Sequence, residues 1–170
     1  MPNFQTLWDN FPDHEEMAKR CQNKQGNGNS QPFDNYCSIL LSECLNKSGV
    51  LVNACPGQKC WSHPGNKHVL RAEELANWLA KSPPAGFKSK EDISASSFQK
   101  DLSGKTGVIF FKDYWQRGNE TTDNRSGDHI DLWNKNRITG GSMLYRSLIE
   151  FFGIVSDLNM SKAVWFWEVK

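Results

Sequence analysis

The sequence lacks a long apolar run and has no marked excess of charge of either sign. It carries 20 Lys and Arg against 19 Asp and Glu, which gives a formal net charge of +1 and a pI of about 7.6. Nucleic-acid-binding domains show a basic stripe or a high pI, so we expect no nucleic-acid partner. No apolar stretch approaches the roughly 18 residues of a transmembrane helix, so we expect no membrane span.

The N-terminal segment also lacks the marks of a secretory signal, because residues 1–9 contain neither a basic stretch nor an apolar one. We therefore expect no export through a signal peptide. No internal repeat is visible, and 170 residues suit one domain. A chain of this length can bury a sufficient hydrophobic core without disulfides or a bound metal. We therefore expect residues 1–170 to form a single domain with no required cofactor.

A cysteine at the start of an apolar helix is the first candidate for chemistry. Residues 39–41, 44, 45 and 48 recur at helical spacing, and Gly49 suits the end of that helix. Asp34 or Asn35 can cap its first turn. Cys37 would then lie over the positive end of a helix dipole, where the thiolate form is favoured and backbone N–H groups can hold an oxyanion.

A histidine far along the chain is the candidate base. In residues 127–134, small or polar residues alternate with apolar ones, as in a half-buried strand. His129 and Asp131 would share one face of that strand. A cysteine at a helix N-terminus facing a histidine on a sheet is the papain arrangement, whose partners adjoin in space rather than in sequence. The long polar segment 113–128 leads into His129 and would flank or cover the site.

The remaining pattern predicts an α+β fold, a small and mainly antiparallel sheet packed against helices. Expected helices span residues 4–21 with a break near Pro12, 71–81, 94–102 and 142–152. Expected strands span residues 50–54, 106–111, 136–139 and 163–169, the last buried on both faces. Residues 23–31 are polar and Gly-rich and are expected to form a loop. Trp61 is expected to cover the core rather than face a substrate.

Two blocks resemble a known family. The segment NYCSILLSECLNKSG, from Asn35, and the segment DHIDLWNKNRIT, from Asp128, resemble the fourth family of peptidoglycan amidase effectors of bacterial type VI secretion. These are NlpC-type, papain-like cysteine peptidases. The segments RAEELANWLA, TGVIFF and AVWFWEV are weaker matches to the same family.

The resemblance implies an antibacterial toxin. It makes Cys37 the nucleophile and His129 the base of an amidase that cuts the stem peptide between D-glutamate and meso-diaminopimelate. It further implies a cognate immunity protein, delivery by the type VI apparatus, and action in the periplasm of the target cell. Related chemistries, acyl transfer and deamidation, use the same residues and would be separated by product analysis.

One part of the family pattern is missing. Members often carry an acid near the end of the segment that here runs Arg137-Ile138-Thr139, and this chain has none before Glu150. We expect Asp131 to orient His129 instead, with Asn134 or Asn136 as alternatives, because an amide can also orient an imidazole.

The five cysteines leave a structural question open. Cys55 and Cys60 flank a Pro-Gly turn and would form a disulfide in an oxidising compartment, which the implied periplasmic target favours. Alternatively both stay free, or Cys55, Cys60, His63 and His68 bind zinc, although the two pairs stand too close for the usual ligand spacing. The competing function of another class is a zinc- or disulfide-stabilised binding module in which Cys37 is merely packed.

Overall fold

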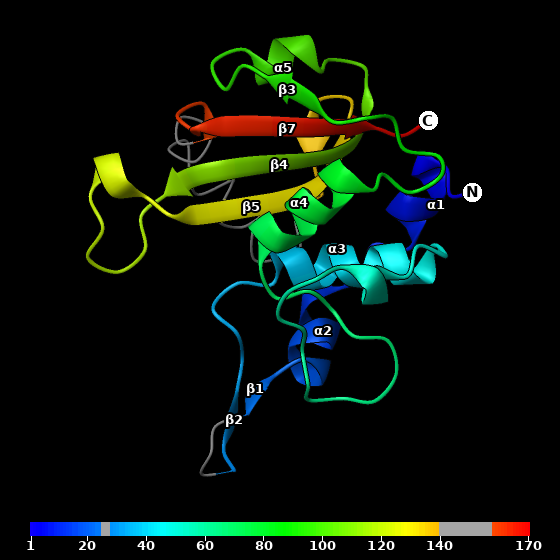
Figure 1. The fold of residues 1–170 in the computed structure, drawn as a ribbon, viewed down its shortest axis with the longest axis vertical. Coiled ribbons are helices and arrows are strands. Elements are labelled where there is room, and N and C mark those ends of the chain that lie inside the picture. The colour runs from blue at the N-terminus through cyan, green and yellow to red at the C-terminus, as the bar shows by residue number, and fades with distance from the viewer. Residues whose placement is uncertain (25–27, 140–157) are drawn as a thin grey trace.

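The computed structural model describes residues 1–24, 28–139 and 158–170, and its centre is a five-stranded antiparallel sheet. In spatial order the strands are β3 (Glu91–Ile93), β7 (Ala163–Glu168), β4 (Thr106–Trp115), β5 (Gly127–Asn134) and β6 (Arg137–Ile138). The long strand β4 lies between β7 and β5, and a short hairpin of β1 (Asn23–Lys24) and β2 (Ser30–Gln31) stands apart from the sheet (Figure 1).

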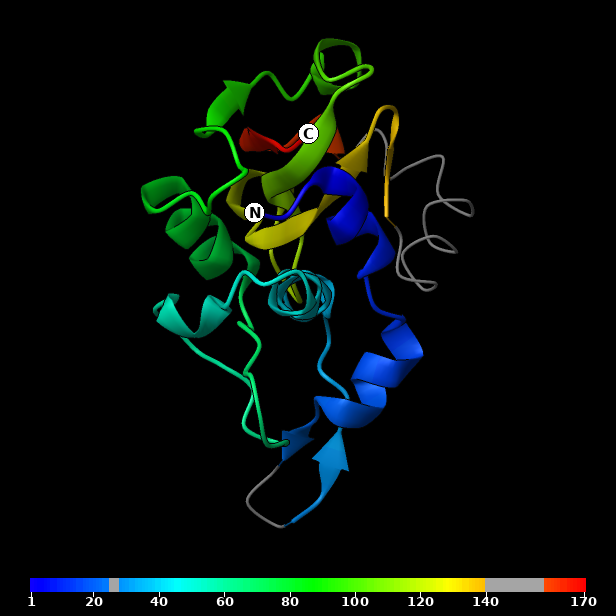
Figure 2. The same cartoon turned by 90° about the vertical axis from the view of Figure 1, so that its right-hand side faces the viewer.

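Helices surround this sheet on several sides. They are α1 (Phe4–Asp9), α2 (His14–Arg20), α3 (Cys37–Lys47), α4 (Ala72–Lys81) and α5 (Phe98–Asp101), with 3-10 turns at Val52–Ala54 and Thr122–Asn124. Helix α3 contacts β5 and lies between α1 and α4, as the turned view shows (Figure 2). The two termini meet, since Phe4 N–H donates to the Lys170 carbonyl at 3.0 Å.

The sheet is covered on both faces, which explains why β4 is an almost continuous apolar run. Val108 and Phe110 face one way and pack into a cluster with α3, which contributes Leu41, Cys44 and Leu45. The alternate residues of β4, Ile109 and Phe111, pack in the opposite cluster with Phe98, Leu102, Trp133, Val164 and Phe166. Helices α3 and α5 therefore cover opposite faces.

Helix α3 is buried on a second side as well. Ile39 and Leu40 belong to a third apolar cluster with Met17, Tyr36 and Cys60, so α2 and the loop after α3 cover the side away from the sheet. Every residue from Cys37 to Leu45 is buried. The enclosure extends to polar side chains, because Ser38, Ser42 and Glu43 of α3 are buried together with its apolar residues.

Most of the predicted elements are present. The α+β class is confirmed, as are helices at α3 and α4 and strands at β4, β5, β6 and β7. Residues 50–54 do not form the expected strand, because Val52 N–H bonds Asn46 Oδ1 (3.1 Å) and Cys55 N–H bonds the Val52 carbonyl (3.0 Å), which closes a local turn. The expected helix at 142–152 lies outside the described residues.

Three smaller differences concern short elements. Strand β3 has three residues and was not expected, the helix predicted over 94–102 is reduced to α5, and the expected loop 23–31 contains the β1–β2 hairpin. Strand β4 runs four residues past the predicted end, to Trp115. Within the described ranges, no helix is long and apolar enough to cross a membrane.

Candidate active site

The first turn of α3 presents Cys37 at the edge of a cavity. Cys37 is the first residue of the helix, and its N–H donates to Asn35 Oδ1 at 2.9 Å. The N-cap is Tyr36, which makes no side-chain capping bond, so the expected cap at Asp34 or Asn35 was wrong, although Asn35 still accepts the first helical N–H from one residue further out. The residue between them, Tyr36, donates its hydroxyl to the Cys21 carbonyl at 2.7 Å and so ties the helix start to the end of α2.

Strand β5 brings His129 to the same place. Its ring stacks on Phe111, with centroids 6.5 Å apart, and meets Tyr114 edge-on at 6.2 Å. His129 Nε2 lies 3.3 Å from Asp131 Oδ2, and both side chains are 2% exposed. Cys37 also acts on the imidazole, since it raises the pKa of His129, and the structure therefore brings the three predicted residues together. In the described part of the chain, His129 Nδ1 is buried and has no hydrogen-bond partner.

The protonation of His129 reflects these neighbours. Burial opposes a charged ring, yet the hydrogen bond to Asp131 and the influence of Cys37 and Asp131 as acidic neighbours outweigh it and raise the pKa of His129 to about 10. Burial raises the pKa of Asp131 too, against hydrogen bonds from His129, Thr139 and the Leu132 N–H. The geometry therefore favours an imidazolium between two acidic groups, the state that a thiolate nucleophile requires.

Asp131 is itself held from two sides. The Leu132 N–H donates to its Oδ1 at 2.7 Å, and the Thr139 hydroxyl donates to the same oxygen. Thr139 belongs to the segment where the family pattern would place an acid, so this chain has a hydroxyl there that supports an acid on the neighbouring strand. The alternatives Asn134 and Asn136 lie at the β5–β6 turn, where Asn136 N–H bonds the Asn134 carbonyl at 2.7 Å.

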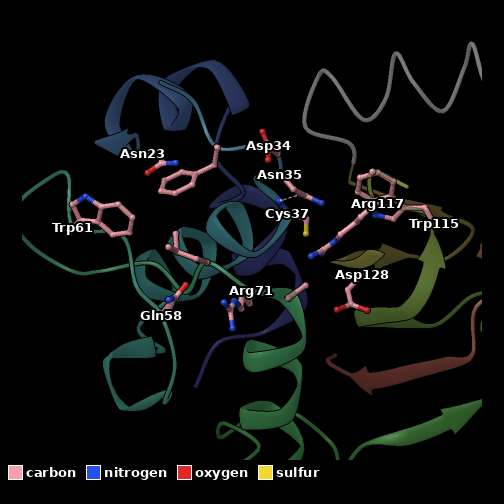
Figure 3. Close-up of a pocket in the computed structure, with 14 residues that line it drawn as sticks. Asn23, Asp34, Asn35, Cys37, Gln58, Trp61, Arg71, Trp115, Arg117 and Asp128 are labelled. Carbon is pink, nitrogen blue, oxygen red and sulfur yellow. Dashed lines mark hydrogen bonds between the residues drawn. The ribbon is translucent and has the colours of Figure 1, made fainter. Parts of the chain in front are cut away.

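Cys37 opens into a cavity of about 570 Å³. Figure 3 shows the thiol between two walls, one carrying Gln58 and Trp61 and the other Trp115, Arg117 and Asp128. The lining residues are Asn23, Phe33, Asp34, Asn35, Cys37, Gln58, Trp61, Leu70, Arg71, Ala72, Trp115, Arg117, Gly118 and Asp128.

Two features whose roles the sequence left open, the segment 113–128 and Trp61, line this cavity. Residues of the segment 113–128 form one wall, so the prediction that it flanks the site is confirmed. Trp61 was expected to cover the core and does not: it is 50% exposed and packs edge-on against Phe33 at 5.9 Å. Sequence periodicity gave no signal for Arg71 or Arg117, since an arginine in a loop or at a helix start is commonly only solvated.

The cysteines outside this site differ from the expectation. All five are free, and the predicted Cys55–Cys60 disulfide is absent from the structure. Cys55 Sγ is directed to the carbonyls of Pro56 (3.3 Å) and Glu74 (3.7 Å). Cys60 Sγ points instead into a buried group with Cys21, His63 and His68, so the alternative zinc set named from the sequence was wrong in one member, Cys55 in place of Cys21.

The comparisons with known proteins agree with this geometry. Residues 33–167 match the model of the family described as Tae4, type VI secretion system amidase effector protein 4. The chain belongs to this family. The resemblance drawn from the two sequence blocks is thereby confirmed, and so is the expected enzyme class, an amidase effector acting on peptidoglycan. No curated protein matches the chain.

Solved structures of Tae4 proteins share the fold. The Tae4 of a Salmonella typhimurium effector–immunity system, Tae4/Tai4, aligns with a TM-score of 0.66 at 19% identity, covering 100% of this chain and 99% of that one. Tae4 from Enterobacter cloacae aligns with a TM-score of 0.63 at 19% identity, covering 100% and 98%. At this identity the likeness concerns the fold alone.

Proposed function

We propose that residues 1–170 act as one amidase domain that hydrolyses the D-glutamyl–meso-diaminopimelate amide of peptidoglycan stem peptides. The observation that carries the proposal is the position of Cys37, at the start of α3 and on the lining of an open cavity, where it acts on the imidazole of His129 on β5. Membership of the amidase effector family supports the substrate class.

The reaction proceeds through an acyl-enzyme. The Cys37 thiolate attacks the amide carbon, and a C–S bond forms while the carbonyl oxygen takes up negative charge. His129 gives its proton to the leaving nitrogen, the C–N bond breaks, and the amine departs. Water then attacks the thioester carbon while His129 accepts its proton, and collapse of this second intermediate releases the acid and restores the thiolate.

Asn35 supplies a donor for the oxyanion. Its Oδ1 is engaged by the Cys37 N–H at 2.9 Å, so the other end of the same amide, Nδ2, is left for the cavity that Asn35 lines. Figure 3 shows Asn35 beside the Cys37 thiol. A side-chain amide is a suitable oxyanion donor because it is fixed before the charge develops. The Cys37 N–H, expected from the sequence to serve, becomes a donor only when Asn35 releases it.

The walls of the cavity suit an acidic peptide. Arg71 and Arg117 lie on its lining, and D-glutamate and diaminopimelate both present carboxylates, which guanidinium groups bind with two parallel hydrogen bonds. Trp61 and Trp115 offer exposed aromatic faces on opposite walls, against which a short peptide can pack. Asp128, on the wall with Arg117, is 8% exposed, and burial raises the pKa of its carboxyl.

The setting of the reaction follows from the family. We propose delivery through a type VI apparatus without a signal peptide and action in the target cell's periplasm, where peptidoglycan is exposed. A cognate immunity protein is expected to close the cavity, since Tae4 structures include complexes with an immunity protein, Tai4.

The decisive test is the replacement Cys37→Ala. We expect the variant to release no soluble fragments from purified peptidoglycan, while circular dichroism and thermal unfolding stay close to wild type, because the side chain is small. Mass spectrometry of wild-type fragments should show cleavage only after D-glutamate. Retention of a tenth of the wild-type rate would exclude Cys37 as the nucleophile, and a transferred acyl group or a deamidated product would replace hydrolysis as the reaction.

The matched control is Cys55→Ser. Cys55 is a buried free thiol on the loop after α3, outside the cavity lining, so this variant should cleave at the wild-type rate. Iodoacetamide near pH 6 should label Cys37 selectively. If all five thiols react alike or Cys37 resists, the alternative of a binding module with a packed Cys37 gains support.

A further inference from the structure

A second group of cysteines and histidines lies in the third apolar cluster, away from the cavity. Cys21 follows α2, and Cys60, His63 and His68 come from the loop between α3 and α4. Their exposed fractions are 0% for Cys21 and His68, 1% for Cys60 and 9% for His63. One ligand atom from each lies within 4.8 Å of all the others. The proposed amide hydrolysis uses none of these four side chains.

The four atoms converge on one point. Cys21 Sγ lies 3.0 Å from His68 Nδ1 and 3.3 Å from His63 Nε2. Cys60 Sγ lies 2.8 Å from His63 Nε2 and 3.3 Å from His68 Nδ1. The two ring nitrogens are 3.2 Å apart. Zinc bonds of about 2.3 Å to sulfur and 2.0–2.1 Å to nitrogen give a tetrahedron with edges of roughly 3.3–3.8 Å, so a small outward shift accommodates the ion.

In a neutral imidazole, the outer contact of each histidine takes the ring proton and leaves the inner nitrogen unprotonated. His63 Nδ1 lies 2.8 Å from the Pro64 carbonyl, which only accepts, so Nδ1 carries the proton and Nε2 presents a lone pair inward. His68 Nε2 lies 2.8 Å from Glu43 Oε2, so its Nδ1 likewise presents a lone pair. The two acceptor nitrogens, His63 Nε2 and His68 Nδ1, therefore face each other at the centre of the group. The nearby donors are the thiols of Cys21 and Cys60, which are weak hydrogen-bond donors.

These outer contacts are the ones that metal-binding histidines make. A ligating imidazole usually donates its other N–H to a carboxylate or a backbone carbonyl, and here one histidine does each. The backbone N–H of His68 also donates to Cys60 Sγ, at 3.4 Å. Glu43 is balanced on its far side by Arg20 at 2.8 Å, so its charge is already compensated.

We propose that Cys21, Cys60, His63 and His68 bind one zinc ion. Two thiolates and a divalent ion cancel in charge, which suits a site among Met17, Tyr36 and Leu40. Four protein ligands leave no open position, so the ion is structural rather than catalytic. Cys21 was missed from the sequence because it lies far along the chain from the compact C-x₂-H-x₄-H run that begins at Cys60.

The ion would fasten one wall of the cavity to the helix that carries Cys37. Gln58 and Trp61, on that wall, flank the ligand Cys60, and the Leu70 N–H bonds the Gln58 carbonyl at 2.9 Å to close the loop. Glu43 reaches the site from α3 itself, and Tyr36, the residue before Cys37, bonds the Cys21 carbonyl. Loss of the ion should therefore loosen substrate binding more than it slows the chemical step.

The test is metal content in the full-length protein without an affinity tag, purified under reducing conditions with zinc in the medium. Elemental mass spectrometry should find about one zinc per chain. Cobalt added to the metal-free protein should give the intense visible bands of a tetrahedral site together with a thiolate-to-cobalt charge-transfer band. Both measurements use the wild-type chain, so they hold even where a ligand variant fails to fold.

Variants then assign the ligands. Cys60→Ser and His68→Ala should lose the zinc, while Cys55→Ser, a buried thiol of the same loop, should keep it. Glu43→Gln should keep the ion but weaken its binding by about 10–100-fold against a competing chelator, because the support of His68 is reduced.

Three results would overturn the proposal. One is a wild-type chain with five titratable thiols that takes up no zinc. Another is a Cys21–Cys60 disulfide, seen as two missing mass units and a linked peptide in freshly purified protein. The third is equal zinc content in wild type and Cys60→Ser, which would mark the ion as bound elsewhere.

Discussion

At the scale of single residues, the contact between His129 and Asp131 sets the pH range of the reaction. The pKa of His129 is raised to about 10, so the imidazolium persists below that pH and is lost above it. On the alkaline side, we expect kcat/KM to decline as the pH rises through about 10. Asp131→Asn removes one of the two negative partners and should move this decline to lower pH by about one unit, with a reduced maximal rate.

A purely structural role of Asp131 would give another outcome, since a loss of folded protein lowers the rate equally at every pH. Thr139→Val serves as the matched control, because it removes the hydroxyl that supports Asp131 but leaves the carboxylate beside His129. It should shift the decline less than Asp131→Asn does. An unshifted profile in Asp131→Asn would transfer the orienting role to another group.

The amide of Asn35 can be tested by a nearly isosteric change. Asn35→Asp keeps an oxygen for the Cys37 N–H but removes the Nδ2 donor and adds a negative charge where the oxyanion forms. We expect kcat to fall by about 10²–10³, the range measured for loss of one oxyanion-hole donor, with little change in thermal stability. Asn35→Ala should lower kcat similarly. If Asn35→Asp is fully active, the oxyanion is held by other groups.

At the scale of elements, α3 is held by the side chains that pack it on β5. Leu45 lies two turns from Cys37 and is fully buried in the cluster that includes Ile130 and Leu132. Leu45→Ala should lower the free energy of unfolding by about 2–5 kcal/mol through lost burial and a cavity, as measured by urea titration. The folded fraction should still cleave peptidoglycan normally.

Leu51 provides the comparison on the same segment of chain. It is 55% exposed, and Leu51→Ala should change the free energy of unfolding by less than about 0.5 kcal/mol. Equal effects of the two substitutions would mean that the packing of α3 on β5 contributes little to stability.

The elements that could be predicted from the sequence are those whose pattern is set locally. Helix α3 and strand β5 could be recognised because their apolar residues recur at helix and strand spacing, and this sufficed to place Cys37, His129 and Asp131. The expected half-buried character of β5 was wrong, because both faces of the strand are covered from Gly127 to Trp133, as α3 is covered from Cys37 to Leu45. Strand β3 is too short to show a period, and it exists because Glu91–Ile93 pairs with β7. Partners that depend on the fold, such as Thr139 for Asp131, leave no local trace.

At the scale of the whole molecule, the cavity lies between two parts of the chain built in different ways. One wall is the loop after α3, closed by backbone bonds and gathered around Cys60 and the buried histidines. The other wall is the segment joining β4 to β5, where Glu120 accepts bonds from Arg117 N–H (2.8 Å) and Ser126 N–H (2.9 Å). The nucleophile lies at their junction, so either wall can alter substrate binding without touching the Cys37–His129 pair.

Arg117, exposed on the second wall, tests whether the cavity binds an acidic peptide. Arg117→Ala should raise KM for stem peptides about fivefold, equivalent to about 1 kcal/mol for a hydrogen bond between charged groups at an exposed site, and leave kcat within about twofold. Added salt should narrow the difference, because screening weakens the wild-type contact. Lys100→Ala, which removes an exposed positive charge from α5 outside the cavity, should leave KM unchanged. If Arg117→Ala lowers kcat at constant KM, the guanidinium acts on the reaction itself and not on recognition of the substrate carboxylate.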